Sequence, residues 1–209
     1  MNADIFPFLQ APIWTACRAG CLAETFFDLH SNNADCKEWL GNSVLSGPLP
    51  FRGIGLVGLA DDEGVKLNNG RRGDKDGPRA IRHALANYGQ TRSIGLSDTA
   101  FGTTIRIVDA GDLIPGRDLT ETHDRVTASV RGLLELGLLP IGIGGGHDLT
   151  FQLVRAVAAA MAGALHGVYF DAHLDVRESL GSGMPFPDRA CHFVASSSTV
   201  TSHRYVALA

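Results

Sequence analysis

Three side chains that can bind a metal ion alternate in the second half of the sequence. Asp171, His173 and Asp175 lie in the segment DAHLD. In an extended chain alternate side chains point to the same side, so these three can converge on one point. Carboxylate oxygens with an imidazole nitrogen suit a divalent ion such as manganese, and the lack of a nearby thiolate disfavours structural zinc. The segment therefore predicts a site for a divalent cation.

A fourth candidate ligand, His147, follows three glycines in the segment GGGHDLT. The ordinary alternative is that His147 only begins a helix and that the aspartates of DAHLD are turn or cap residues. Neither segment decides the matter alone. The metal site is favoured if the fold brings the two segments together.

The pattern of strands and helices predicts such a meeting. Apolar or β-branched runs predict four strands, at residues 53–60 and 103–112, from 138 and from 165. Helices are expected from Pro78 to Gly89, from about Asp118, and after Asp148. Asp148 is expected to cap its helix. Alternating strands and helices favour a mainly parallel sheet with helices on both faces. Ligands of such sheets bind beyond the carboxyl ends of the strands. GGGHDLT and DAHLD follow the third and fourth strands, so both are expected at one edge of the sheet.

Composition excludes several other classes of protein. With 209 residues, 44% of them hydrophobic and 19% charged, the chain is expected to bury a substantial core. The net charge of -4 argues against nucleic acid as a partner. No apolar run approaches the roughly 20 residues of a membrane helix, and the start MNADIFPFLQ lacks a secretory pattern. We therefore expect a cytoplasmic protein acting on a small molecule, without a membrane partner.

The cysteines give no competing metal site. Cys17, Cys21 and Cys36, with His30, match none of the usual zinc spacings. Four cysteines in the chain are also too few and too unevenly placed for a disulfide framework. We expect ordinary reduced thiols.

At this point the sequence resembles a known family. GGGHD at 144–148 and DAHLD at 171–175 are similar to two of the three signature motifs of the ureohydrolases, the arginase and agmatinase superfamily of binuclear manganese hydrolases. The segments 68–82 and 108–112 resemble the family's glycine-rich loop with its helix, and its second strand and turn. The resemblance runs from 53 to 186. It implies an arginase-like, three-layer α/β/α fold with a mainly parallel sheet.

The resemblance also implies a role for each candidate ligand. Asp171 would bridge two Mn²⁺ ions, His147 and Asp175 would complete the sphere of one ion, and His173 would bind the other. Two cations that share carboxylates lower the pKa of a water between them and direct it at a planar carbon. In this family that carbon belongs to an amidine or guanidine.

The segment after DAHLD narrows the choice within the family. Arginases and agmatinases usually have a histidine where this chain has Phe186, and the turn GSGMPF looks instead like the formimidoylglutamases, which hydrolyse N-formimino-L-glutamate to glutamate and formamide in histidine degradation. Arg177 suits the substrate's carboxylates, and Ser182 is a possible further donor. Alternatively, Arg177 is a surface charge paired with Glu178 or Asp175, and Ser182 a turn residue. An agmatinase-like guanidino hydrolase is the other enzymatic reading.

The family's third metal motif, with its alternating aspartates, does not occur in this sequence, so the fold is expected to be C-terminally incomplete. We predict an irregular lead-in at 1–52 with at most short helices, a partial arginase-like domain at 53–186 and an unrelated tail at 187–209. A shifted reading frame or a truncation would explain such a tail. An incomplete sheet favours a compensating homo-oligomer. The missing ligands would leave the second metal with one bridging acid and one histidine, so that site is expected to be weak. A non-catalytic remnant that binds metal weakly is therefore the alternative to an enzyme.

Overall fold

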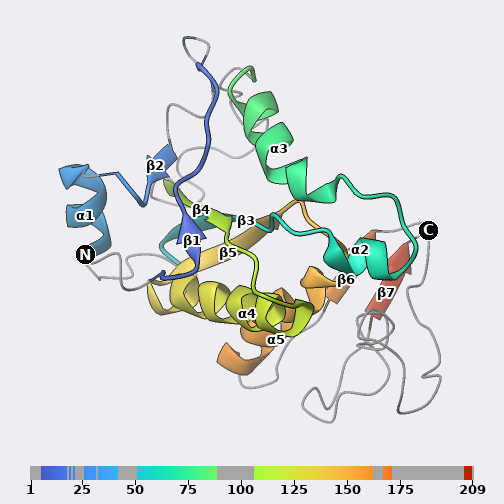
Figure 1. Ribbon diagram of the computed structural model, residues 1–209. Helices are drawn as coiled ribbons and strands as arrows, with labels where there is room; N and C mark the ends of the chain where they lie inside the picture. Colours follow the sequence, from blue (N-terminus) through green and yellow to red (C-terminus); the bar gives the residue numbers. More distant parts are fainter. Residues whose placement is uncertain are drawn as a thin grey trace.

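A five-stranded sheet organises the described part of the chain (Figure 1). The computed structural model describes residues 6–17, 19, 21, 26–31, 33–41, 51–88, 106–161, 167–170 and 205–208. The strands are β1 (Leu9–Gln10), β2 (Phe26–Asp28), β3 (Gly53–Gly58), β4 (Arg106–Leu113) and β5 (Leu138–Ile143). Their order is β1–β4–β3–β5, with β2 also paired to β4, and only the β1–β4 pairing is antiparallel.

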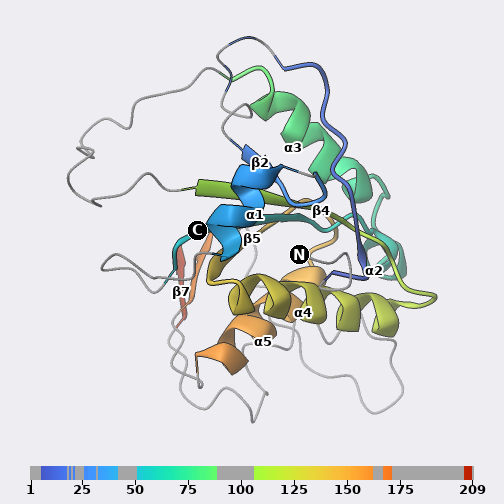
Figure 2. The same cartoon turned by 90° about the vertical axis from the view of Figure 1, so that its left-hand side faces the viewer.

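Helices lie on both sides of this sheet. They are α1 (Ala34–Gly41), α2 (Glu63–Leu67), α3 (Gly77–Leu85), α4 (Leu119–Glu135) and α5 (Leu149–Ala160), with a short 3-10 turn η3 (Asp74–Asp76). Helix α3 lies on one side of the sheet, and α4 and α5 pack together on the other (Figures 1 and 2). The predicted α/β class with a mainly parallel sheet is confirmed. Within the described ranges, no helix is long and apolar enough to span a membrane.

The lead-in is more ordered than the sequence suggests. Strands β1 and β2 both add to β4, where at most short helices were expected. Arg52 ties α1 to the sheet, because its guanidinium donates to the carbonyls of Leu136 and Leu40 over 2.8 and 2.7 Å. Strands of two and three residues carry too little periodicity to be read from sequence, and their pairing with β4 defines them.

The fourth expected strand forms, but in a different sheet. Strand β6 (Gly167–Phe170) pairs in parallel with β7 (Tyr205–Leu208), a segment in which no clean strand period was expected. In the described chain the main sheet ends at β5, so β6 is not its next strand. DAHLD lies outside the described residues, so the expected meeting of GGGHDLT and DAHLD stays a prediction. Backbone pairing with YVAL, a short run of β-prone residues, replaces the pairing with β5.

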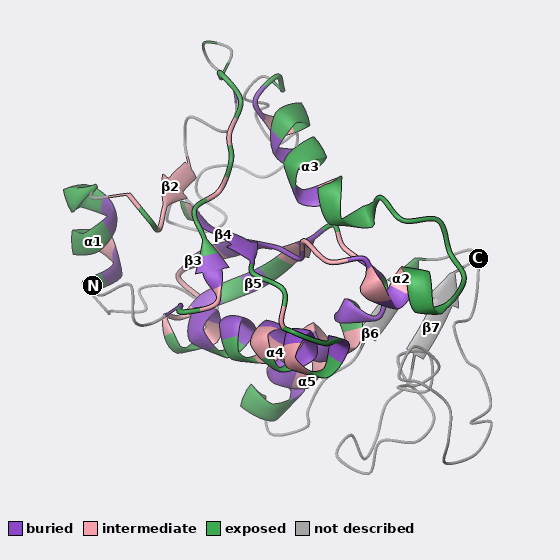
Figure 3. Cartoon of the chain, viewed as in Figure 1, coloured by how far each residue is buried: buried purple, intermediate pink, exposed green. Residues whose placement is uncertain are grey.

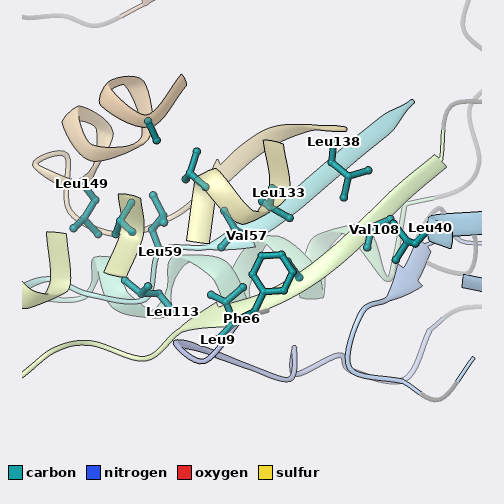
Figure 4. Packing of buried hydrophobic residues seen from close by; sticks show 14 of the residues in the cluster. Phe6, Leu9, Leu40, Val57, Leu59, Val108, Leu113, Leu133, Leu138 and Leu149 are labelled. Atoms are coloured by element: carbon teal, nitrogen blue, oxygen red, sulfur yellow. The ribbon is translucent and has the colours of Figure 1, made fainter. Parts of the chain in front are cut away.

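The core lies between the sheet and α4. Buried side chains concentrate along β3, β4 and the inner face of α4 (Figure 3), and Val57, Val108 and Leu133 are fully buried. Leu133 packs directly over Gly55, where an added Cβ would lie 2.9 Å from its Cδ2. Phe6 and Leu9 close the cluster from the lead-in (Figure 4). The glycine in β3 thus lets α4 approach the sheet closely.

A buried charge cluster joins α3 to β4. Arg82 has no exposed surface and donates to both oxygens of Asp109 at 2.8 Å and to Asp112 at 2.5 Å. Asp112 itself lies against Gly58, where a Cβ would come within 1.8 Å of its carboxylate. A bidentate guanidinium contact of this kind is strong only while every partner is present, because a buried unpaired charge is costly.

We predict that Arg82→Met will lower the free energy of unfolding by about 3–5 kcal/mol, because it leaves two carboxylates buried without a cation. Arg82→Lys will recover little of the loss, since an ammonium cannot reproduce the forked contact. Urea unfolding measures both. The control is Arg79→Ala, because Arg79 is 66% exposed and its pairing with Asp76 is loose at 3.6 Å. Equal stability of the Arg82→Met and Arg79→Ala proteins would contradict this account.

The side chain of Asp118 caps the start of helix α4. The Asp118 carboxylate accepts a hydrogen bond from the Glu121 N–H at 2.8 Å, and Glu121 in turn accepts from the Arg117 N–H at 2.9 Å. The hydrogen bond from the Arg117 side chain, aided by that N–H and by Arg125, lowers the pKa of Glu121 to about 2 from an ordinary 4.5. A carboxylate whose pKa is lowered on folding stabilises the folded state above its unfolded pKa.

This cap predicts a pH dependence of stability. The contribution of Glu121 is complete above about pH 4.5 and is lost as the pH falls towards about 2. The Glu121→Gln protein lacks it, so wild type should lose stability more steeply than this variant across that window. Urea unfolding at a series of pH values makes the comparison. Parallel profiles for the two proteins would show that the carboxylate is not stabilised by its neighbours.

Candidate metal centre

The glycines after β5 form a turn that only glycine fits. Gly144 and Gly145 have φ of 68° and 79°, the left-handed region that disfavours other residues. A Cβ on Gly145 would lie 1.9 Å from the carbonyl oxygen of Leu59, and one on Gly144 would lie 2.4 Å from the Pro78 ring. The turn is therefore wedged between the chain after β3 and the start of α3.

Backbone hydrogen bonds fix the same turn. The Gly145 N–H donates to the Asp74 carbonyl at 3.1 Å, and the Gly146 N–H donates to the Asp61 carbonyl at 2.9 Å. The two accepting carbonyls belong to different segments, the η3 turn and the chain that follows β3. The path of the chain up to His147 is thus set by backbone contacts.

His147 leaves this turn at the protein surface. Its side chain is exposed, and its carbonyl oxygen accepts a hydrogen bond from the Thr150 N–H at 3.1 Å in the first turn of α5. An accessible imidazole on a fixed backbone fits the requirements of a metal ligand. In the described part of the chain, no three His, Cys, Asp or Glu side chains come close enough to hold an ion.

Asp148 does not cap α5 with its side chain, contrary to the expectation. It has helical dihedral angles, φ -55° and ψ -28°, and its side chain makes no cap hydrogen bond. A capping side chain requires an extended residue, which Asp148 is not. Instead, the carboxylate is buried and lies 2.8 Å from Nε2 of His123 on α4. No sequence motif marks His123, although it lies three residues before Val126 on the buried stripe of α4.

Acidic side chains surround the base of the turn. Asp62 is buried and accepts a hydrogen bond from the Gly73 N–H at 2.9 Å, which holds the glycine-rich loop. Burial raises the pKa of the Asp61 carboxyl, and the nearby carboxylates of Asp148 and Asp62 raise it further.

Most of the predicted site lies elsewhere in the chain. The expected ligands Asp171, His173 and Asp175, and the expected substrate residues Arg177 and Ser182, lie outside the described residues. Their roles stay predictions. Arg71 in the glycine-rich loop and Arg79 in the first turn of α3 both have exposed side chains.

Comparison with known proteins decides the family. A sequence profile of the arginase family matches residues 52–207, which is most of the chain. The chain belongs to the arginase family. The match extends beyond residue 186, into the segment that the sequence analysis separates as a tail.

Arginase-family members that this chain resembles include formimidoylglutamases. That of Chromobacterium violaceum is 36% identical over 138 residues, and that of Aeromonas salmonicida is 37% identical over 140 residues. Each alignment covers 64% of this chain and 41% of the relative. The chain thus spans less than half the length of these curated relatives.

Solved structures give the same result. The structure of Trypanosoma cruzi formiminoglutamase with Mn²⁺ superimposes with a TM-score of 0.63 at 31% identity, covering 74% of this chain and 51% of that one. Proclavaminate amidino hydrolase from Streptomyces clavuligerus superimposes with a TM-score of 0.52 at 29% identity, covering 64% and 43%. The arginase-like fold is therefore shared across enzymes with different named substrates.

The turn makes a direct prediction. Gly145→Ala will lower the free energy of unfolding by about 2 kcal/mol or more, because it combines a strained dihedral angle with a clash against the Leu59 carbonyl. The matched control is Gly41→Ala in α1, where nothing lies within 4 Å of an added Cβ, and a change within about 1 kcal/mol is expected. Urea unfolding compares them. A Gly145→Ala protein as stable as the Gly41→Ala protein would refute the wedged turn.

Proposed function

We propose that this chain hydrolyses a C–N bond of a linear amidine, N-formimino-L-glutamate, in a manganese-dependent reaction. The observation that carries the proposal is its 36–37% identity to formimidoylglutamases over 138 and 140 aligned residues. Further support comes from the turn itself, which fixes the backbone at His147 and leaves its imidazole accessible. A cytoplasmic location and a homo-oligomeric state belong to the same proposal.

His147, Asp171, His173 and Asp175 are the residues that would hold Mn²⁺. Nitrogen and carboxylate donors without thiolate suit this ion. When bound, a pair of such cations supplies Lewis acidity and lowers the pKa of a water. In the overall reaction water oxygen adds to the formimino carbon, one proton goes to the imine nitrogen, and the other goes to the glutamate nitrogen as its bond to carbon breaks. The products are glutamate and formamide.

Two further residues would bind the substrate. Arg177 is proposed to pair with a carboxylate of the glutamate portion, since a guanidinium and a carboxylate form charge-assisted, often bidentate, hydrogen bonds. Ser182 would donate one more hydrogen bond. Together these contacts would orient the formimino carbon relative to the ligands.

A guanidino hydrolase is the second candidate. The superposition on proclavaminate amidino hydrolase favours it, because that protein is named for action on an amidino group. A non-catalytic remnant is the third, since the sequence lacks the family's third metal motif. The three candidates differ in product and in metal stoichiometry, and a single set of measurements separates them.

The test uses the full chain, freed of metal and then titrated with Mn²⁺. We expect metal-dependent formamide release from N-formimino-L-glutamate, and at least about 100-fold loss of release and of Mn²⁺ affinity in His147→Ala, because removing a ligand costs no less than removing an outer-shell partner. The control is His83→Ala, an exposed histidine on α3. Urea release from agmatine or arginine would establish the second candidate. Weak Mn²⁺ binding without turnover, or full activity of His147→Ala, would overturn the proposed reaction or its metal site.

A further inference from the structure

A buried histidine and a buried aspartate face each other beneath the glycine turn. His123 on α4 is 3% exposed and Asp148 is 7% exposed. Their Nε2 and Oδ2 atoms are 2.8 Å apart, although the residues are 25 positions apart in sequence. The contact fits the His123 tautomer that carries its proton on Nε2 and donates it to the carboxylate. The pair therefore links α4 to the residue that directly follows His147.

The Asp148 carboxylate packs closely against two glycines. A Cβ on Gly64 of α2 would lie 2.3 Å from its Oδ1 atom, and a Cβ on Gly146 would lie 2.5 Å from the same oxygen. The absence of side chains at both glycines makes room for this carboxylate between α2 and the turn. Because the side chain makes no cap hydrogen bond to α5, helix capping does not account for its position.

We propose that the hydrogen bond from His123 to Asp148 positions His147 for metal binding. This inference rests on the proposed function, in which His147 is a ligand. The backbone is held before His147 by the bond from Gly146 to Asp61, and it is held after His147 by the Asp148 side chain. His123 is thus a positioning residue that acts through its neighbour. Groups that orient ligands in this way strengthen metal sites by reducing the freedom lost on binding.

A second contact between the same helices supplies a matched control. The Arg155 guanidinium on α5 donates to Thr127 Oγ1 on α4 at 2.7 Å, one helical turn beyond His123. It joins α4 and α5 as the His123 contact does. Thr127 Oγ1 also donates to the His123 carbonyl at 3.1 Å, but neither bond involves the His123 ring or the Asp148 carboxylate. Removing it tests whether any loss of helix contact weakens the metal site.

The experiment compares His123→Met, His123→Gln and Thr127→Val in the full chain. Methionine and glutamine are close in size, but only glutamine keeps an N–H donor. We expect about tenfold weaker Mn²⁺ binding in His123→Met, the low end for outer-shell partners, partial recovery in His123→Gln, and no change in Thr127→Val. Equilibrium dialysis gives the affinity per folded molecule, with the folded fraction taken from near-ultraviolet circular dichroism. The visible spectrum of the Co²⁺-loaded protein should change only where the ligand geometry changes.

His147→Ala separates the inference from the proposed function. If His147→Ala binds Mn²⁺ as wild type does, the proposed ligand role fails. If His147→Ala weakens binding but His123→Met binds no worse than Thr127→Val, the positioning role fails while the proposed function stands. Should the His123 variants not fold, Asp148→Ala removes the contact from the other side, and wild-type affinity in that protein would overturn the inference.

Discussion

The arrangement of this protein depends on the close approach of three backbone segments at one end of the sheet. The turn after β5 touches the chain after β3 through the Leu59 carbonyl, and it touches the start of α3 through Pro78. Neither approach leaves room for a Cβ at Gly144 or Gly145. The glycines are therefore a steric requirement of the fold as well as a flexible link to His147. The direction in which His147 leaves the sheet follows from where α3 and the chain after β3 lie.

The buried charge cluster of Arg82, Asp109 and Asp112 holds α3, which contacts the glycine turn. Helix α3 contacts the turn at its first residues, and one turn later Arg82 binds the carboxylates of β4. Gly58 admits both Asp112 and Pro78, since a Cβ there would lie 1.8 Å from the one and 2.8 Å from the other. A shift of α3 would therefore disturb the ion pairs and the turn together. The buried ion pairs of Arg82 and the turn before His147 therefore both depend on the position of α3.

Long, periodic elements were predictable from sequence, and the elements defined by pairing were not. Strand β3 and helix α4 carry sustained apolar patterns, and Pro78 and Asp118 mark the starts of two helices as expected. Strands β1 and β2 are too short for any period. The placement of β6 depends on a partner almost forty residues later, which no local pattern specifies. Asp148 was misread because a cap and a buried hydrogen-bond partner have the same residue type at the same position.

The candidate site shows the same division between local and distant information. GGGHD identifies His147, because the glycines and the histidine are adjacent in the chain. His123 is invisible to any motif, since it acts from another helix and its type is common on half-buried helix faces. The backbone hydrogen bonds of the turn and the His123–Asp148 contact fix the chain around His147 without a metal ion, because they form when the chain folds. The backbone around His147 is therefore ordered in the folded chain, and the entropy of fixing that backbone does not oppose metal binding at this proposed ligand. The affinity of the proposed site then depends on the ligands proposed in DAHLD.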